Sequence, residues 1–192
     1  MSTQTSIKIS NLLPKDFCEF FTHVLLRKSS QQDNVTDNQV PTCLSTMDHE
    51  IMFETVLERI WPTIESVVKE ELLPTYAFSR LYHNGDELPQ HTDRPACEVS
   101  LSVQLGRSHH YSWPIFVGGN RFDLGEGDAV VYFGCDTPHW REKCDGPENY
   151  YSGQVFFHFV RKNGPYADQA GDSQNRIPPN FVKNRTALME TK

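Results

Sequence analysis

Long apolar runs are absent from this sequence of 192 residues. No stretch approaches the roughly 20 apolar residues that a membrane-spanning helix needs, so we expect no membrane partner. The opening residues also lack the basic and apolar parts of a secretory signal. These two absences predict a cytoplasmic protein.

Positive charge is scarce, because 18 Lys and Arg residues face 25 Asp and Glu residues, for a formal net charge of -7. Binding to the phosphates of nucleic acids requires a basic surface, so nucleic acid is disfavoured as a partner. The 5 cysteines are an odd number and contain no C-x-x-C pair. This pattern argues against a disulfide framework and a structural zinc site, and we expect free thiols.

Helical spacing of apolar residues marks the N-terminal part of the chain. The first predicted helix covers about 11–28, and a second helical region covers about 48–73. We expect Pro62 to kink or divide the second region, because proline removes a helix hydrogen bond. Residues 31–46 are polar and without a period, which predicts a surface loop.

After Pro74 the pattern changes to short runs rich in Val, Phe and Tyr, separated by Gly, Asp, Asn and Pro. Such runs are typical of strands, and eight of them at this spacing predict a mainly β domain with a jelly roll flanked by two or three helices. We expect one domain over 1–166, with the jelly roll from about 74, and an extended polar tail over 167–192. The predicted strands cover residues 76–83, 88–93, 98–105, 111–117, 120–124, 129–133, 137–142 and 152–160.

His91 and Asp93 are two residues apart on a predicted strand, so their side chains project from the same face and could chelate one metal ion. A pair of this kind occurs by chance in many proteins. His139 adds a third candidate ligand after the apolar strand of the segment GDAVVYFGCDTPHWRE. Two histidines and one carboxylate on a β-scaffold form the metal-binding set of non-haem Fe(II) oxygenases.

Longer motifs surround these three residues. They read YHNGDELPQHTD over 82–93, EVSL over 98–101, GD over 127–128 and PHWR over 138–141. In this order the motifs resemble the Fe(II)/2-oxoglutarate-dependent dioxygenase superfamily, and specifically its prolyl-4-hydroxylase-like branch. The resemblance covers about 76–160, a little under half of the chain, and implies a double-stranded β-helix in which His91, Asp93 and His139 hold Fe(II).

The same resemblance implies an activity. Members of this superfamily bind 2-oxoglutarate on the iron and use O2 to convert it to succinate and CO2, while a C–H bond of a second substrate is hydroxylated. Ascorbate is expected to support turnover. The fold is shared across many substrates, so the sequence leaves a peptide and a small molecule open as substrates, and it leaves the oligomeric state open.

Two residues are expected to contact the 2-oxoglutarate. Tyr82 stands at the tyrosine that opens the family's Y-x-x-G segment, and its phenol could hydrogen-bond the cosubstrate. Gln104 belongs to a predicted strand on which polar and apolar residues alternate, so that one face would line a cavity. Gln104 is therefore a predicted cavity contact.

The sequence departs from the family where a basic residue usually binds the C5 carboxylate of 2-oxoglutarate. Members of this branch place a Lys or Arg about ten residues after the second histidine, but the corresponding window here holds Glu148, Asn149 and Tyr150. A carboxylate withdrawn from water requires a partner, and a guanidinium matches it with two hydrogen bonds. Arg141 is the predicted partner, and Arg80 is the second candidate.

Two other functions remain open at this stage. One is a metal-dependent cupin enzyme that does not use 2-oxoglutarate, and the other is a non-catalytic jelly-roll binding module. The remaining histidines do not favour a further site: His109 and His110 would point to opposite faces of a strand, and His158 lies among apolar residues typical of a core. Trp113 and Trp140 could line a substrate entrance or pack in the core.

Overall fold

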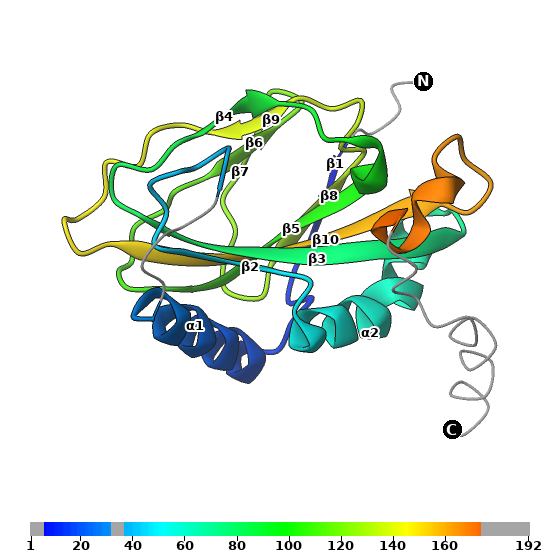
Figure 1. Cartoon of the computed structure of the whole chain (residues 1–192). Coiled ribbons are helices and arrows are strands. Elements are labelled where there is room, and N and C mark those ends of the chain that lie inside the picture. The colour runs from blue at the N-terminus through cyan, green and yellow to red at the C-terminus, as the bar shows by residue number, and fades with distance from the viewer. Residues whose placement is uncertain (1–5, 32–36, 174–192) are drawn as a thin grey trace.

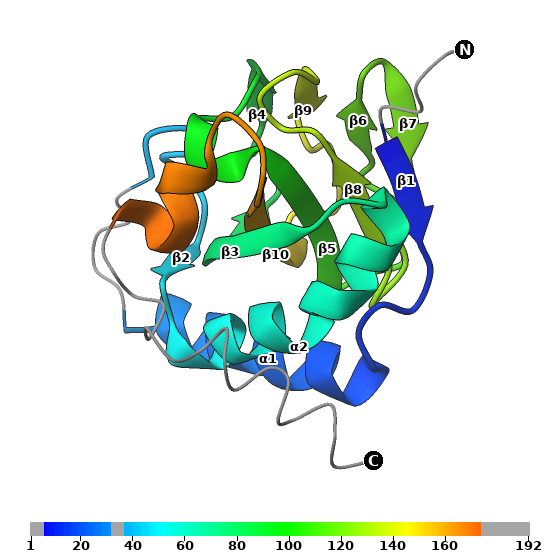
Figure 2. The same ribbon diagram turned by 90° about the vertical axis from the view of Figure 1, so that its right-hand side faces the viewer.

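The computed structural model describes residues 6–31 and 37–173. Its strands form two antiparallel sheets, one above the other, and both α-helices cover the outer face of the larger sheet (Figure 1, Figure 2). This arrangement confirms the predicted jelly roll with flanking helices.

The larger sheet contains, in spatial order, β1 (Ser6–Ile9), β8 (Ala129–Tyr132), β5 (Val99–Arg107), β10 (Tyr151–Arg161), β3 (Leu72–His83) and β2 (Ser45–Asp48). The smaller sheet contains β4 (Leu88–His91), β9 (His139–Arg141), β6 (Ile115–Val117) and β7 (Asn120–Phe122).

The main hydrophobic core lies between the two helices and the larger sheet. Helix α1 (Lys15–Ser29) and helix α2 (Ile51–Val68) each bury one apolar stripe against this sheet, as their helical spacing predicts. On β5, Leu101, Val103 and Leu105 are fully buried in the same core. Each such side chain stabilises the fold by about 1.5 to 3 kcal/mol.

The intervening residues of β5 face the opposite way, towards the smaller sheet. They are Ser100, Ser102 and Gln104, all of them buried. The next strand, β10, presents Gln154 and His158 opposite them in the ladder, with Gln154 paired to Gln104 and His158 paired to Ser100. These residues of β5 and β10 therefore bring polar groups into the space between the two sheets, alongside aromatic residues such as Phe156, whereas the space under the helices is apolar.

The second helical region differs from its prediction in two ways. Pro62 does not divide the region: helix α2 continues to Val68, because its buried face, which includes Trp61 and Ile64, packs on the sheet and outweighs the one hydrogen bond that proline loses. The helix ends at Lys69, whose φ of 62° lies in the left-handed region. The predicted helix to residue 73 is wrong, since β3 already begins at Leu72.

All eight predicted strands are present as β3 to β10, with shifted bounds. Strand β3 contains Pro74, which is tolerated because β2 covers only Phe78–Leu81 of β3 and the ladder with β10 is irregular opposite Pro74. Strand β4 ends at His91, so Asp93 lies just beyond it. Strand β6 begins only at Ile115.

Two further strands, β1 and β2, do not follow from the sequence pattern. Each has four residues and lies at one edge of the larger sheet. The segment expected to be a loop over 31–46 therefore ends in a strand, and 32–36 lie outside the described residues. Short edge strands carry too few residues for a clear alternation, so their pairing partner decides their structure.

The start of the predicted C-terminal tail is not extended. Residues Ala167–Ser173 form η2, two short helical turns separated by a kink at 170–172, which pack against β3. Residues 174–192 lie outside the described residues. A second short helix, η1 (Pro95–Cys97), follows β4. Within the described part of the chain, no helix combines the length and the apolar character needed to cross a membrane.

Candidate active site

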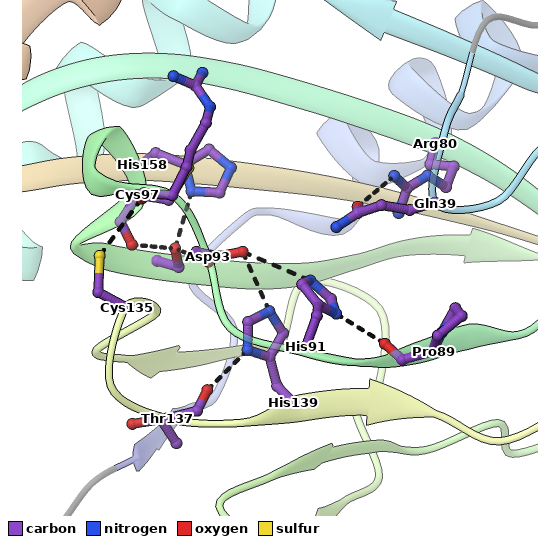
Figure 3. Close-up of polar contacts among 12 residues, drawn as sticks. Gln39, Arg80, Pro89, His91, Asp93, Cys97, Cys135, Thr137, His139 and His158 are labelled. Atoms are coloured by element: carbon purple, nitrogen blue, oxygen red, sulfur yellow. Dashed lines mark hydrogen bonds and ion pairs between the residues drawn. The ribbon is translucent and has the colours of Figure 1, made fainter.

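His91, Asp93 and His139 come together between the sheets (Figure 3). His91 and His139 are direct partners in the β4–β9 ladder, and their ring centroids are 4.2 Å apart. Asp93 Oδ1 lies 3.6 Å from His91 Nε2 and 3.4 Å from His139 Nε2. One ligand atom from each residue lies within 4.8 Å of the others, so the three predicted metal ligands can reach one ion.

Backbone carbonyls fix the orientation of both imidazoles. His91 Nδ1 lies 2.8 Å from the carbonyl oxygen of Pro89, and His139 Nδ1 lies 2.9 Å from that of Thr137. Because a carbonyl oxygen only accepts, each Nδ1 carries a hydrogen, and each Nε2 is the ring nitrogen that faces the Asp93 carboxylate and can bind a metal ion once it carries no proton. Metal-binding histidines in proteins commonly show this pattern.

The negative charge of the Asp93 carboxylate also suits metal binding. Burial by itself would raise the pKa of this carboxyl, but the imidazoles of His139 and His91 outweigh burial and hold the pKa well below its usual range. Two neutral imidazoles and one carboxylate on one side of an ion suit Fe(II) and leave coordination positions open. Asp93 Oδ2 faces away from the histidines and accepts a hydrogen bond from Ser100 Oγ at 2.7 Å.

A cavity of about 500 Å³ opens beside the three residues. This volume lies within the range of small-molecule binding sites in proteins. Its wall opposite the candidate ligands is aromatic, with Tyr76 and Phe78 from β3 and Phe156 from β10. A substrate in this cavity would therefore lie between an apolar wall and the candidate metal ligands.

Arg80 lines this cavity, but its charge is already paired. Its Nε donates to Asp37 Oδ2 at 2.6 Å, and its Nη1 donates to the phenol oxygen of Tyr82 at 2.7 Å. Asp37 also accepts hydrogen bonds from the amides of Gln39 and Val40, so Arg80 holds this loop against the cavity. Tyr82 is fully buried, beside Arg80, and is not a lining residue of the cavity.

Arg141 is fully buried between the sheets and is not among the cavity-lining residues. Its Nη1 donates to the carbonyl oxygen of Trp113 at 2.6 Å and its Nη2 donates to Gln154 Oε1 at 3.2 Å. Its Nε has no hydrogen-bond partner among the described residues, and no described carboxylate pairs with it. Burial lowers the pKa of this guanidinium, which nevertheless keeps its charge at neutral pH.

Gln104 lies in a polar network beside Arg141. Its amide group contacts Ser152 Oγ, and its Oε1 accepts a hydrogen bond from Gln154 Nε2. Gln104 was predicted to contact the cavity, but it is not among the residues that line it. Instead, Gln104 supports Gln154, which in turn accepts from the guanidinium of Arg141.

No protein-family model matches the chain, and no curated protein matches it. Several solved structures match the chain in fold. A prolyl-4-hydroxylase from Pseudomonas putida matches with a TM-score of 0.63 and 15% identity, over 85% of this chain and 95% of that chain. An oxidoreductase of the 2OG-Fe(II) oxygenase family from Burkholderia pseudomallei has a TM-score of 0.61 and 14% identity, over 83% and 86%. HygX from Streptomyces hygroscopicus, with nickel and 2-oxoglutarate bound, has a TM-score of 0.55 and 12% identity, over 80% and 83%.

This chain has the fold of the 2OG-Fe(II) oxygenases. The resemblance inferred from the motifs is therefore borne out by the architecture. The apolar segment VFFHFV around His158 did not indicate that this residue borders the cavity. His158 is buried as expected, but it lines the cavity and contacts Ser100 rather than packing in the apolar core. The alternation along β10, which places His158 on the same face as Gln154, was the available signal.

The other candidate residues remain apart from this site. His109 and His110 are exposed in the turn after β5 and do not approach the three candidate ligands. Trp113 is buried with its ring edge against Tyr82, and its indole nitrogen donates to the carbonyl oxygen of Glu142. Trp140 stacks on Phe116 of the smaller sheet. Neither tryptophan lines the cavity.

Proposed function

We propose that this protein is a non-haem iron oxygenase that hydroxylates a C–H bond with O2 and 2-oxoglutarate, releasing succinate and CO2. One observation carries the proposal: both histidines direct Nε2 towards the Asp93 carboxylate, at the edge of a cavity. The 2OG-Fe(II) oxygenase fold agrees with it. When bound, Fe(II) supplies the oxidising chemistry by which O2 attacks 2-oxoglutarate and the substrate.

The chain's own residues would bind the metal and shield one side of it. His91, Asp93 and His139 would hold the iron by three positions, which leaves the others to the cosubstrate and O2. The side chain of His139 is 3% exposed and that of His91 is 21% exposed, so the metal would be partly shielded from bulk solvent at the edge of the cavity. The aromatic wall formed by Tyr76, Phe78 and Phe156 would hold the substrate's C–H bond near the metal.

Arg141 is the residue that we propose as the partner of the C5 carboxylate of 2-oxoglutarate. A buried guanidinium with a free Nε–H and no described carboxylate partner requires an anion, and a dicarboxylate would supply one. Arg80 is less suited, because Asp37 already neutralises it. Gln104 would support the cosubstrate through Gln154, which contacts Arg141, whereas the phenol of Tyr82 accepts a hydrogen bond from Arg80.

The substrate would be a small molecule or a segment of a peptide that fits the cavity. Prolyl hydroxylation is one outcome, because the matched structures include a prolyl-4-hydroxylase, and the cavity suits a single ring or a short side chain. Arg80 and Arg94 are the two arginines among the described lining residues, and each is already paired, with Asp37 and Asp172 respectively.

A screen for succinate tests this proposal. The purified protein is given Fe(II), ascorbate, O2 and 2-oxoglutarate, with amino acids, peptides and metabolites added one at a time. We expect succinate above the substrate-free rate for at least one candidate, together with a product 16 mass units heavier, the mass of one oxygen atom. A metal-loaded protein that does not bind 2-oxoglutarate would instead favour a cupin enzyme, and a protein that binds no metal would favour a binding module.

A further inference from the structure

Beyond Asp93, on the side away from His91 and His139, lies the side chain of His158 (Figure 3), and Ser100 links it to the Asp93 carboxylate. Ser100 Oγ lies 2.7 Å from Asp93 Oδ2, and His158 Nδ1 lies 3.0 Å from Ser100 Oγ. Ser100 is fully buried and His158 is 7% exposed. Both residues come from the larger sheet, whereas both histidine ligands come from the smaller sheet.

The direction of these hydrogen bonds follows from the acceptors. The single hydroxyl hydrogen of Ser100 can go to Asp93 Oδ2, or to the carbonyl oxygen of Cys97 at 3.0 Å. The Asp93 carboxylate is nearer to Ser100 Oγ than the Cys97 carbonyl and is charged, so it accepts the hydrogen bond from Ser100. His158 Nδ1–H therefore donates to Ser100, and Ser100 donates to Asp93.

The backbone of Gly134 closes the remaining space around the same oxygen. A methyl group added at Gly134 would clash with Asp93 Oδ2 and would lie 2.8 Å from Ser100 Oγ. The carbonyl oxygen of Gly134 also accepts a hydrogen bond from the Asp93 amide at 2.9 Å. Asp93 Oδ2 is therefore enclosed on this side, and Oδ1 is the oxygen that faces the two histidines.

We propose that Ser100 and His158 are positioning residues that hold Asp93 as a one-oxygen metal ligand. The inference rests on the proposed function, because it concerns the ligands of the same metal. Ser100, itself held by His158, occupies Oδ2 and so prevents the carboxylate from binding through both oxygens, which would fill a position that the cosubstrate or O2 needs. Hydrogen-bond partners of this kind typically change metal affinity 10- to 100-fold when they are removed.

Mn(II) titration by calorimetry, with neither cosubstrate nor turnover, is the first test. We expect Ser100→Ala to weaken Mn(II) binding about 10- to 100-fold. His158→Leu, which removes the N–H donor, should have a smaller effect, and His158→Asn, which keeps an N–H in a similar place, should recover part of it. Ser102→Ala is the matched control, because Ser102 is buried on the same face of β5 and its Oγ has no hydrogen-bond partner among the described residues.

The visible spectrum of bound Co(II) is the second test, since it reports the number of ligand atoms. We expect Ser100→Ala to change this spectrum, because a released carboxylate can bind through both oxygens, and Ser102→Ala to leave it unchanged. Wild-type affinity together with a wild-type spectrum in Ser100→Ala overturns the inference, as does an equal loss in Ser102→Ala. A wild-type protein that binds no Mn(II) contradicts the proposed function itself, and the inference then fails with it.

Discussion

His91 and His139 are direct cross-strand partners in the β4–β9 ladder, and their imidazole rings lie 4.2 Å apart. This pairing holds the two Nε2 atoms at a spacing set by the backbone hydrogen bonds of the sheet. Asp93 lies two residues after His91 and reaches both rings. Two rigid strands thus hold two of the candidate ligands in place before any metal binds.

Removing either histidine should abolish metal binding. We expect His91→Ala and His139→Ala to lose both Fe(II) binding and turnover, because two remaining ligands hold the ion too weakly. Metal content after gel filtration and Mn(II) or Co(II) titration measure the change. His109→Ala, in an exposed turn, is the control and should bind metal as the wild type does. Wild-type affinity in both ligand variants would contradict the metal site.

Binding of 2-oxoglutarate to the iron-loaded protein should be visible. Under anaerobic conditions we expect a weak absorption band when 2-oxoglutarate is added, because a 2-keto acid that chelates Fe(II) through two oxygens gives a charge-transfer transition. The band should disappear with O2, while succinate forms. A metal-loaded protein that shows neither a spectral nor a calorimetric response to millimolar 2-oxoglutarate would contradict the cosubstrate assignment.

Arg141→Ala should weaken 2-oxoglutarate binding at least about 30-fold, because truncating one partner of a buried charge pair costs about 2 to 5 kcal/mol. Arg141→Lys should recover part of the loss, since an ammonium cannot form the paired hydrogen bonds of a guanidinium. Calorimetric titration of the Mn(II)-loaded protein measures both, and metal affinity should stay unchanged.

Two comparisons make the Arg141 result specific. Arg107→Ala should bind 2-oxoglutarate normally, because Arg107 contacts the carbonyl oxygen of Tyr111 in a surface loop away from the cavity. Circular dichroism of Arg141→Ala establishes that the fold survives the truncation. If Arg80→Ala loses binding while Arg141→Ala keeps it, Arg80 is the partner of the C5 carboxylate.

Asp128 should stabilise the fold in a pH-dependent way. Its carboxylate accepts hydrogen bonds from the amides of Asn11 and Gly125 and pairs with Lys8 at 2.9 Å. Burial alone would raise the pKa of Asp128, but Lys8 and the two amides outweigh it and lower that pKa. Asp128→Asn should therefore reduce the free energy of unfolding by about 1 to 2 kcal/mol at neutral pH.

The sign of the pH dependence follows from the lowered pKa. The stabilisation is fully present above the unfolded-state pKa of about 3.9 and is lost as the pH falls through the lower pKa of the folded state. Urea unfolding of the wild type and of Asp128→Asn between pH 7 and pH 3 should show a difference that shrinks at the acid end. A difference that grows on acidification would contradict the assignment. Asp123→Asn should show a smaller change in stability, because the pair of Asp123 with Arg121 and Ser112 is exposed to solvent.

The sequence by itself predicted the eight strands from β3 to β10 and the residues His91, Asp93 and His139. Alternation and turn residues are local signals, and the candidate metal ligands occur in motifs whose order along the chain carries the information. The two edge strands could not be predicted in this way, since each has four residues and depends on its neighbour in the sheet. The continuation of α2 through Pro62 likewise depends on packing.

Only the tertiary structure distinguished the two arginines. Arg80 and Arg141 were both candidates for the cosubstrate, and both prove to be buried. Their difference lies in their partners: Arg80 meets Asp37, 43 residues earlier, whereas Arg141 meets a carbonyl and an amide oxygen and no described carboxylate. A buried charge is governed by the groups that surround it in space, and strands from distant parts of the chain supply those groups.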